Sequence, residues 1–230
     1  MTLPARRYTP DHPAAEPAAP IVQVASMPLP VARVEKKGFR LDKALHLDEV
    51  HFLRSWIEKP LATGAVMPSG RLLARAMARH VDPGAEGPVI ELGPGTGPVT
   101  EALVQRGVDP GRLILVEFNP SFCRLLRTRY PTATVVQGDA YRLRGLLENL
   151  VKAPAAALVS SLPLMTKPLR TRVRLISDAM HLMAPGAPFV QFTYAMVTPI
   201  PKATSNITVR GSELVWANLP PARVWVYRGR

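Results

Sequence analysis

The chain has 230 residues, enough for one sizeable hydrophobic core but cramped for two full domains. No apolar run reaches the roughly 18 residues of a membrane span, and the lone cysteine, Cys123, excludes an internal disulfide and fits a reducing cytoplasm. The net charge of +12 favours a polyanionic partner, either nucleic acid or the anionic face of a membrane, over a solvated basic surface without a partner.

The N-terminal part is expected to hold a leader and two helices. Residues 1–38 are rich in proline and alanine and are predicted to be disordered, with no secretory signal. Residues 42–59 have the period of an amphipathic helix, and a second helix is predicted to begin after Pro68 with Ser69 as its N-cap. The first helix has the composition of one that lies in the headgroup plane of a membrane, although its stripe is also compatible with packing on the core. Its candidate membrane-binding residues are Lys43, Val50, Phe52, Leu53, Arg54, Trp56, Ile57 and Lys59.

From residue 88 onwards, strand patterns alternate with helical patterns. Strands are predicted over 88–92, 113–118, 134–139, 156–163 and 189–196, and helices over 99–107, 121–130, 141–150 and 169–183. Buried strands separated by helices indicate a parallel sheet, while the segment 213–227 predicts two antiparallel strands joined at 218–221. The predicted fold class is therefore α/β: a doubly wound, mostly parallel seven-stranded sheet with an antiparallel C-terminal hairpin and N-terminal helices.

A glycine-rich turn links the first of these strands to the helix that follows it. Glycine permits a tight turn and the close approach of a ligand, and the amides at the next helix N-terminus can receive an anionic group. The dinucleotide pattern G-x-G-x-x-G would need a glycine where Pro98 stands. The spacing is E-x-G-x-G-x-G instead, carried by Glu91, Gly93, Gly95 and Gly97, and it resembles motif I of S-adenosylmethionine-dependent methyltransferases.

Two further acids lie at the ends of the next two strands. Glu117 ends the second strand, where a carboxylate can accept hydrogen bonds from ribose hydroxyls, and Asp139 ends the third. This combination with the glycine turn is hard to obtain by chance; the alternative is a Rossmann-like fold that has lost its ligand. The methyltransferase resemblance implies a cofactor-binding set of Met67, Pro68, Ser69, Glu91, Gly93, Pro94, Gly95, Thr96, Gly97, Glu117, Phe118, Asn119, Asp139, Ala140 and Ser160.

The turn after the fourth strand is where enzymes of this fold that methylate amines often carry an N-P-P-Y-like motif. The chain reads Ser160-Ser161-Leu162-Pro163-Leu164, close to the N-L-P-Y form of rRNA adenine dimethyltransferases but without the leading amide and the closing ring. Main-chain oxygens of this turn, rather than hydroxyl groups, are expected to hold an acceptor amine. Tyr194 at the end of the fifth strand either faces the methylated amine, by its ring or its hydroxyl, or simply packs. The catalytic candidates are Tyr194, Ser160, Ser161 and Leu162.

From about Phe39 onwards the whole chain resembles bacterial phospholipid N-methyltransferases. The segments that carry the resemblance are 52–77, 89–100, 159–165, 189–196 and 216–227. The resemblance implies an enzyme that uses S-adenosyl-L-methionine, releases S-adenosyl-L-homocysteine, and methylates phosphatidylethanolamine stepwise through mono- and dimethyl forms to phosphatidylcholine. It also points to the helix over 42–59 as the membrane contact.

These observations predict a leader over 1–38, membrane-contact and cofactor-covering helices over 39–80, and a methyltransferase domain over 81–230. The expected partners are an anionic phospholipid surface and phosphatidylethanolamine; nucleic acid, an obligate protein partner and a metal are not expected. The expected location is cytoplasmic, peripheral on the inner face of the cell membrane. Two alternatives remain. The first is an rRNA adenine N6-dimethyltransferase, which is disfavoured because Leu164 stands in place of an aromatic ring and because too few residues are left for a C-terminal helical domain. The second is a non-catalytic cofactor-binding membrane or RNA adaptor.

Overall fold

The computed structural model describes residues 68–195, 197–201, 207–216, 218 and 221–229, all within a unit that spans Arg40–Arg230. The predicted leader and the predicted helix over 42–59 lie outside the described residues, so neither prediction is tested. Among the described helices, none is long and apolar enough to cross a membrane.

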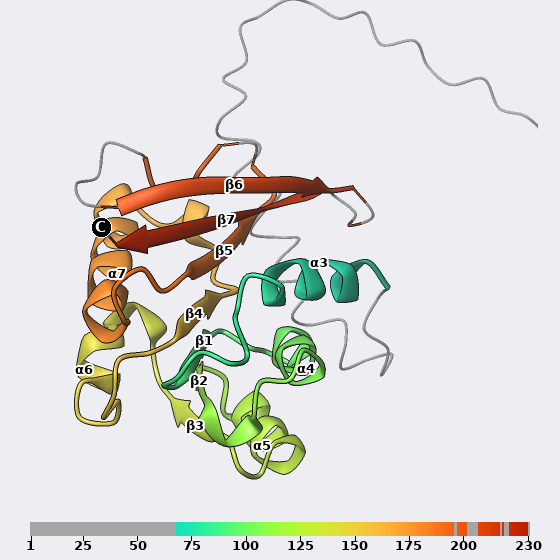
Figure 1. Ribbon diagram of the computed structural model, residues 1–230, viewed down its shortest axis with the longest axis vertical. Coiled ribbons are helices and arrows are strands. Elements are labelled where there is room, and N and C mark those ends of the chain that lie inside the picture. The colour runs from blue at the N-terminus through green and yellow to red at the C-terminus, as the bar shows by residue number, and fades with distance from the viewer. Residues whose placement is uncertain (1–67, 196, 202–206, 217, 219–220, 230) are drawn as a thin grey trace, which may run out of the picture. The chain divides into compact units, whose positions relative to one another are not determined.

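A seven-stranded sheet forms the centre of the molecule (Figure 1). Its spatial order is β3-β2-β1-β4-β5-β7-β6, in which β1 to β5 run parallel and β7 is antiparallel to both of its neighbours. This arrangement confirms the predicted fold class, including the antiparallel hairpin at one edge. The strands are β1 (Val89–Leu92), β2 (Leu113–Glu117), β3 (Thr134–Gln137), β4 (Ala157–Ser160), β5 (Phe189–Thr193), β6 (Ile207–Val215) and β7 (Ala222–Gly229).

Helices cover both faces of this sheet, which explains why its central strands are buried and mostly apolar. On one face, Leu73 and Leu103 pack with Val89; on the other, Leu175 packs with Ile90. Successive strand residues therefore enter opposite cores, as the pleat requires. The first face carries α3 (Pro68–Ala78), α4 (Pro98–Gln105) and α5 (Pro120–Arg129), and the second carries α6 (Leu143–Leu147) and α7 (Leu169–Leu182) (Figure 1).

Several predicted boundaries are wrong. Ser69 lies inside the first turn of α3, because the helix already begins at Pro68, whose fixed φ suits a first helical turn. The helix predicted over 141–150 is divided into the 3-10 turn η2 (Ala140–Arg142), capped by Asp139, and the short α6. The fourth strand ends at Ser160 and the fifth at Thr193, while β6 begins at Ile207, well before the predicted start of the hairpin. Two more 3-10 turns are η1 (Pro110–Arg112) and η3 (Leu164–Thr166).

Candidate active site

The glycine turn between β1 and α4 has the backbone that its sequence requires. Gly93, Gly95 and Gly97 have φ values of 68°, 57° and 88°, a region that residues with a Cβ rarely adopt. A Cβ atom on Gly95 would meet no atom within 4 Å, so this part of the turn faces open space. Gly97 is the N-cap of α4 and has no side chain with which to cap it. The turn therefore presents backbone to a ligand beside a helix N-terminus.

Glu117, at the end of β2, connects this turn to the next helix. Its Oε2 accepts a hydrogen bond from the Gly95 amide (3.0 Å), and its Oε1 accepts one from the Asn119 amide (2.8 Å). A carboxylate has about four lone-pair positions, so each oxygen retains one for a further donor such as a ribose hydroxyl. The neighbouring Phe118 is 75% exposed and offers an apolar ring beside that carboxylate.

The other polar residues of the predicted cofactor set take part in local capping. Asn119 Oδ1 accepts from the Ser121 amide (2.8 Å) at the start of α5, and Asp139 Oδ1 accepts from the Tyr141 amide (3.0 Å) at the start of η2. Asp139 is exposed and Ala140 is buried. Of the remaining members, Met67 lies outside the described residues, and the side chains of Pro68 and Ser69 are not described.

Glu91, the acid of the motif, is completely buried inside β1. Its Oε2 accepts a hydrogen bond from Thr100 Oγ1 of α4 (2.7 Å), while its Oε1 has no partner among the described residues. Burial is the main cause that raises the pKa of Glu91 to about 8; the charge of Glu117 adds to the increase, and the Thr100 hydrogen bond opposes it. Near neutral pH the carboxyl is therefore mostly protonated, which places a neutral polar group beneath the glycine turn.

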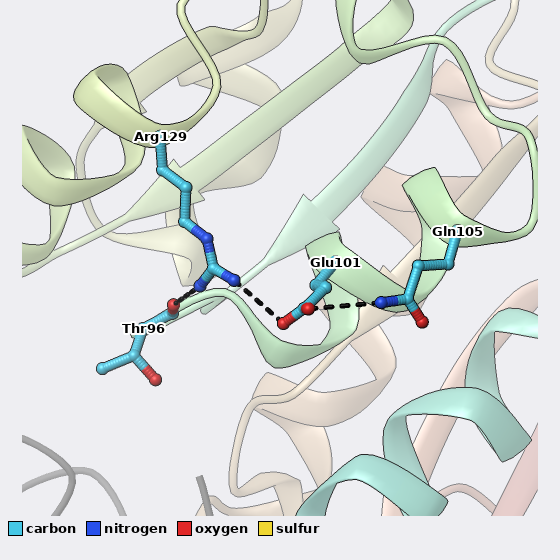
Figure 2. A network of polar contacts seen from close by, with 4 residues as sticks. All are labelled: Thr96, Glu101, Gln105 and Arg129. Carbon is cyan, nitrogen blue, oxygen red and sulfur yellow. Dashed lines mark hydrogen bonds and ion pairs between the residues drawn. The ribbon is translucent and has the colours of Figure 1, made fainter. Parts of the chain in front are cut away.

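An exposed network holds the turn from outside. Arg129 of α5 donates to the Thr96 carbonyl (3.2 Å) and to Glu101 Oε2 of α4 (2.9 Å), and Gln105 Nε2 donates to Glu101 Oε1 (3.2 Å) (Figure 2). One guanidinium thus ties the turn to α4. Sequence reasoning missed both this network and Thr100, because the contacts of Arg129 and of Thr100 join residues of different elements.

The turn after β4 lies directly beside the cofactor turn. A Cβ atom on Gly93 would lie 3.1 Å from Leu162 Cδ2, and the Ser161 amide donates to the Leu92 carbonyl (2.9 Å). Ser160 is completely buried, and its Oγ lies 3.4 Å from the Leu162 amide, from which it accepts a hydrogen bond. A ligand held by the glycine turn would therefore adjoin the predicted acceptor turn.

Gln191 of β5, which the sequence analysis did not select, fastens this acceptor turn to the fifth strand. Its completely buried side chain donates through Nε2 to the Leu162 carbonyl (2.9 Å) and to the Phe192 carbonyl (2.7 Å). The Leu162 oxygen also accepts a hydrogen bond from the Leu164 amide (2.8 Å), so both of its lone pairs are in use. The signal in the sequence was an amide in the middle of an apolar strand.

A small pocket of about 10 Å³ opens at this turn, roughly the space that one water-sized group needs. Tyr194 is not among its lining residues: the ring packs edge-on against Phe192 (centroids 5.5 Å apart) and joins the core on the α3 and α4 face. Packing is one of the two roles that the sequence analysis left open for Tyr194; the other is contact with the methylated amine. The pocket is lined by Leu162, Pro163, Leu164, Met165, Phe192, Thr193 and Pro199.

Comparison with known proteins identifies the family. No protein-family model matches the chain. It is 30% identical over 186 residues to an ornithine lipid N-methyltransferase of Singulisphaera acidiphila, a match that covers 77% of this chain and 94% of that protein. The chain belongs to the ornithine lipid N-methyltransferase family. It is an S-adenosylmethionine-dependent N-methyltransferase, and the resemblance to bacterial lipid N-methyltransferases is confirmed.

Two further similarities fit this family. A ribosomal RNA small subunit methyltransferase A of a Synechococcus species is 35% identical over 95 residues, which are 40% of this chain and 31% of that protein. The solved structure of the N-methyltransferase NodS from Bradyrhizobium japonicum, in complex with S-adenosyl-L-homocysteine, superposes with a TM-score of 0.56 at 14% identity, covering 79% of this chain and 98% of that one. The second similarity supports the fold of this methyltransferase.

The cofactor of this methyltransferase fits the residues that the structure brings together. The open space at Gly95, the unpartnered Oε1 of Glu91 and the remaining lone pairs of Glu117 are the features that a ligand with a polar amino-acid end and a ribose requires. Gly93, Gly95 and Gly97 would surround the amino-acid end and Glu117 would accept the ribose hydroxyls. When bound, S-adenosylmethionine supplies an electrophilic methyl group on a sulfonium.

Proposed function

We propose that this enzyme methylates the primary amine of phosphatidylethanolamine, in steps that end at phosphatidylcholine. The observation that carries the proposal is the similarity to a lipid N-methyltransferase over 94% of that protein's length. The segments by which the chain resembles phospholipid N-methyltransferases support the choice of headgroup.

The acceptor turn supports an amine as the nucleophile. We propose that a main-chain oxygen of the turn, other than the Leu162 oxygen that Gln191 and Leu164 already use, accepts a hydrogen bond from an amine N–H. This bond would direct the nitrogen lone pair away from the turn. Methyl transfer needs this orientation and little acid–base chemistry. Among the described residues, the pocket lining contains no carboxylate or imidazole, so we propose that the amine reacts as the free base and releases its proton to water.

An ornithine lipid is the second candidate acceptor. The relative from Singulisphaera is named for that substrate, and an acylated ornithine, like phosphatidylethanolamine, carries a primary amine at the end of a lipid headgroup. Both candidates bring the same nucleophile to the Leu162 turn.

The reaction is proposed to take place at the inner face of the cell membrane, with the enzyme bound peripherally from the cytoplasm. The support is electrostatic: a net charge of +12 attracts an anionic lipid surface, to which each nearby basic residue contributes about 1 kcal/mol. The predicted amphipathic helix over 42–59, with Phe52 and Trp56 in its apolar stripe, would supply the hydrophobic part of the contact.

Lipid analysis in a living host tests the proposal. The chain is expressed in bacteria that contain phosphatidylethanolamine and ornithine lipid but no phosphatidylcholine, with Glu117→Ala as the matched inactive control. We expect mono- and dimethyl-phosphatidylethanolamine and phosphatidylcholine with the wild type alone. Methylated ornithine lipid without methylated phosphatidylethanolamine would establish the second candidate, and unchanged lipids with a well-expressed protein would refute both.

A further inference from the structure

Arg172 of α7 borders the acceptor pocket from the helix side. Its Nη1 donates to the Pro199 carbonyl (2.6 Å) and lies 3.5 Å from Met165 Sδ. Met165 and Pro199 both line the pocket. The guanidinium therefore lies one residue layer from the place where the amine is proposed to react.

The charge of this guanidinium has no counterpart in the described part of the chain. Two other arginines on this face of the sheet form ion pairs with carboxylates: Arg174 of α7 lies 3.9 Å from Asp178, and Arg144 of α6 lies 3.2 Å from Glu148. Arg172 forms no ion pair with any described carboxylate, and its buried Nε has no hydrogen-bond partner among the described residues.

A half-buried cation in this state favours an anionic ligand. Removing a charged donor from water is costly unless an acceptor replaces the lost hydration, and a guanidinium bonded to an anion forms short, charge-assisted hydrogen bonds. The planar fork of arginine matches the oxygen pairs of phosphate and carboxylate groups. An anion that arrives with the substrate would supply the missing partner.

We propose that Arg172 forms a subsite for the anionic group of the lipid headgroup, beside the pocket that receives the amine. The inference rests on the proposed function and extends it to substrate selection. Phosphatidylethanolamine has a phosphate diester two carbons from its amine, and an acylated ornithine has a carboxylate on the same headgroup. The enzyme thus selects lipids that combine an amine with a nearby anion, and it discriminates against simple alkyl amines.

Binding to the protein loaded with S-adenosyl-L-homocysteine tests this subsite without any turnover. Calorimetry compares two soluble probes, dihexanoyl-phosphatidylethanolamine and decylamine, which has the amine but no anion. We expect Arg172→Gln to weaken binding of the phospholipid at least tenfold and to change binding of decylamine less than twofold. Arg172→Lys, which keeps the charge without the fork, should restore part of the affinity. Arg170→Gln, which removes an exposed charge from the same helix, is the matched control and should bind both probes normally.

The outcomes separate this inference from the proposed function. Equal losses for both probes, or no loss, would overturn the subsite, because Arg172 would then only hold the loop at Pro199. If Arg172→Gln does not fold, the lysine variant decides by the same comparison, with a selective loss for the phospholipid as the expected result. A wild type that binds the phospholipid through Arg172 but never methylates it in vesicles would refute the proposed function and leave the subsite in place.

Discussion

Replacing Glu91 with glutamine removes a titratable group from the core with little change in side-chain volume. The folded protein holds the Glu91 pKa at about 8, above its usual 4.5, mainly by burial, so between these values the folded state binds a proton that the unfolded state has released. The contribution of Glu91 to the free energy of unfolding therefore falls by about 1.4 kcal/mol for each pH unit in this range. The wild type loses this stability between pH 4.5 and 8, whereas Glu91→Gln, which can still accept from Thr100, does not.

Between pH 5 and pH 8 the stability of Glu91→Gln relative to the wild type should therefore increase by about 4 kcal/mol. At about 2–4 °C per kcal/mol for a domain of this size, the difference in melting temperature should grow by about 10 °C. Thermal unfolding followed by circular dichroism at both pH values measures it, with Glu86→Gln, an exposed carboxylate, as the control. A difference that is the same at both pH values would show that Glu91 is ionised in the fold, and the reasoning would fail.

Substitutions at three other places test the cofactor site, the acceptor site and the predicted membrane contact. Glu117→Ala should weaken binding of S-adenosyl-L-homocysteine at least tenfold by calorimetry, because charge-assisted hydrogen bonds contribute about 1.5–3 kcal/mol each; unchanged affinity would place the ribose elsewhere. Tyr194→Phe should keep near-normal turnover while Tyr194→Ala loses it, since the ring packs on Phe192; a large loss for phenylalanine would instead assign a role to the hydroxyl. The double substitution Phe52→Asp and Trp56→Asp should abolish sedimentation with anionic liposomes and preserve cofactor binding. A folded double variant that still sediments would exclude the predicted helix over 42–59 as the membrane anchor.

Local sequence patterns were sufficient for the sheet and for the cofactor turn. Apolar runs such as 113–118 lie between turn residues because parallel strands are buried on both faces, and the three glycines are needed where φ is positive. Boundaries were less accurate where side chains compete for the backbone: Asp139 caps η2 and so divides a segment whose periodicity indicated one continuous helix.

The residues that the sequence analysis missed act through contacts between distant parts of the chain. Gln191 reaches Leu162 across 29 positions and Arg172 reaches Pro199 across 27, and no local periodicity encodes such pairs. In the sequence, Arg172 is one of three alternating arginines and cannot be told from Arg170 or Arg174. Only the packing of α7 beside the acceptor turn distinguishes it.

The most direct test of the central claim is one competition experiment in vitro. The purified chain is incubated with S-adenosylmethionine labelled on the methyl group, together with anionic vesicles that contain phosphatidylethanolamine and ornithine lipid, and with small-subunit rRNA. The label should enter the phosphatidylethanolamine fraction first and reach phosphatidylcholine later, with none in the RNA. Label in adenine of the rRNA, or no transfer to either lipid by a protein that binds S-adenosyl-L-homocysteine, would contradict the account.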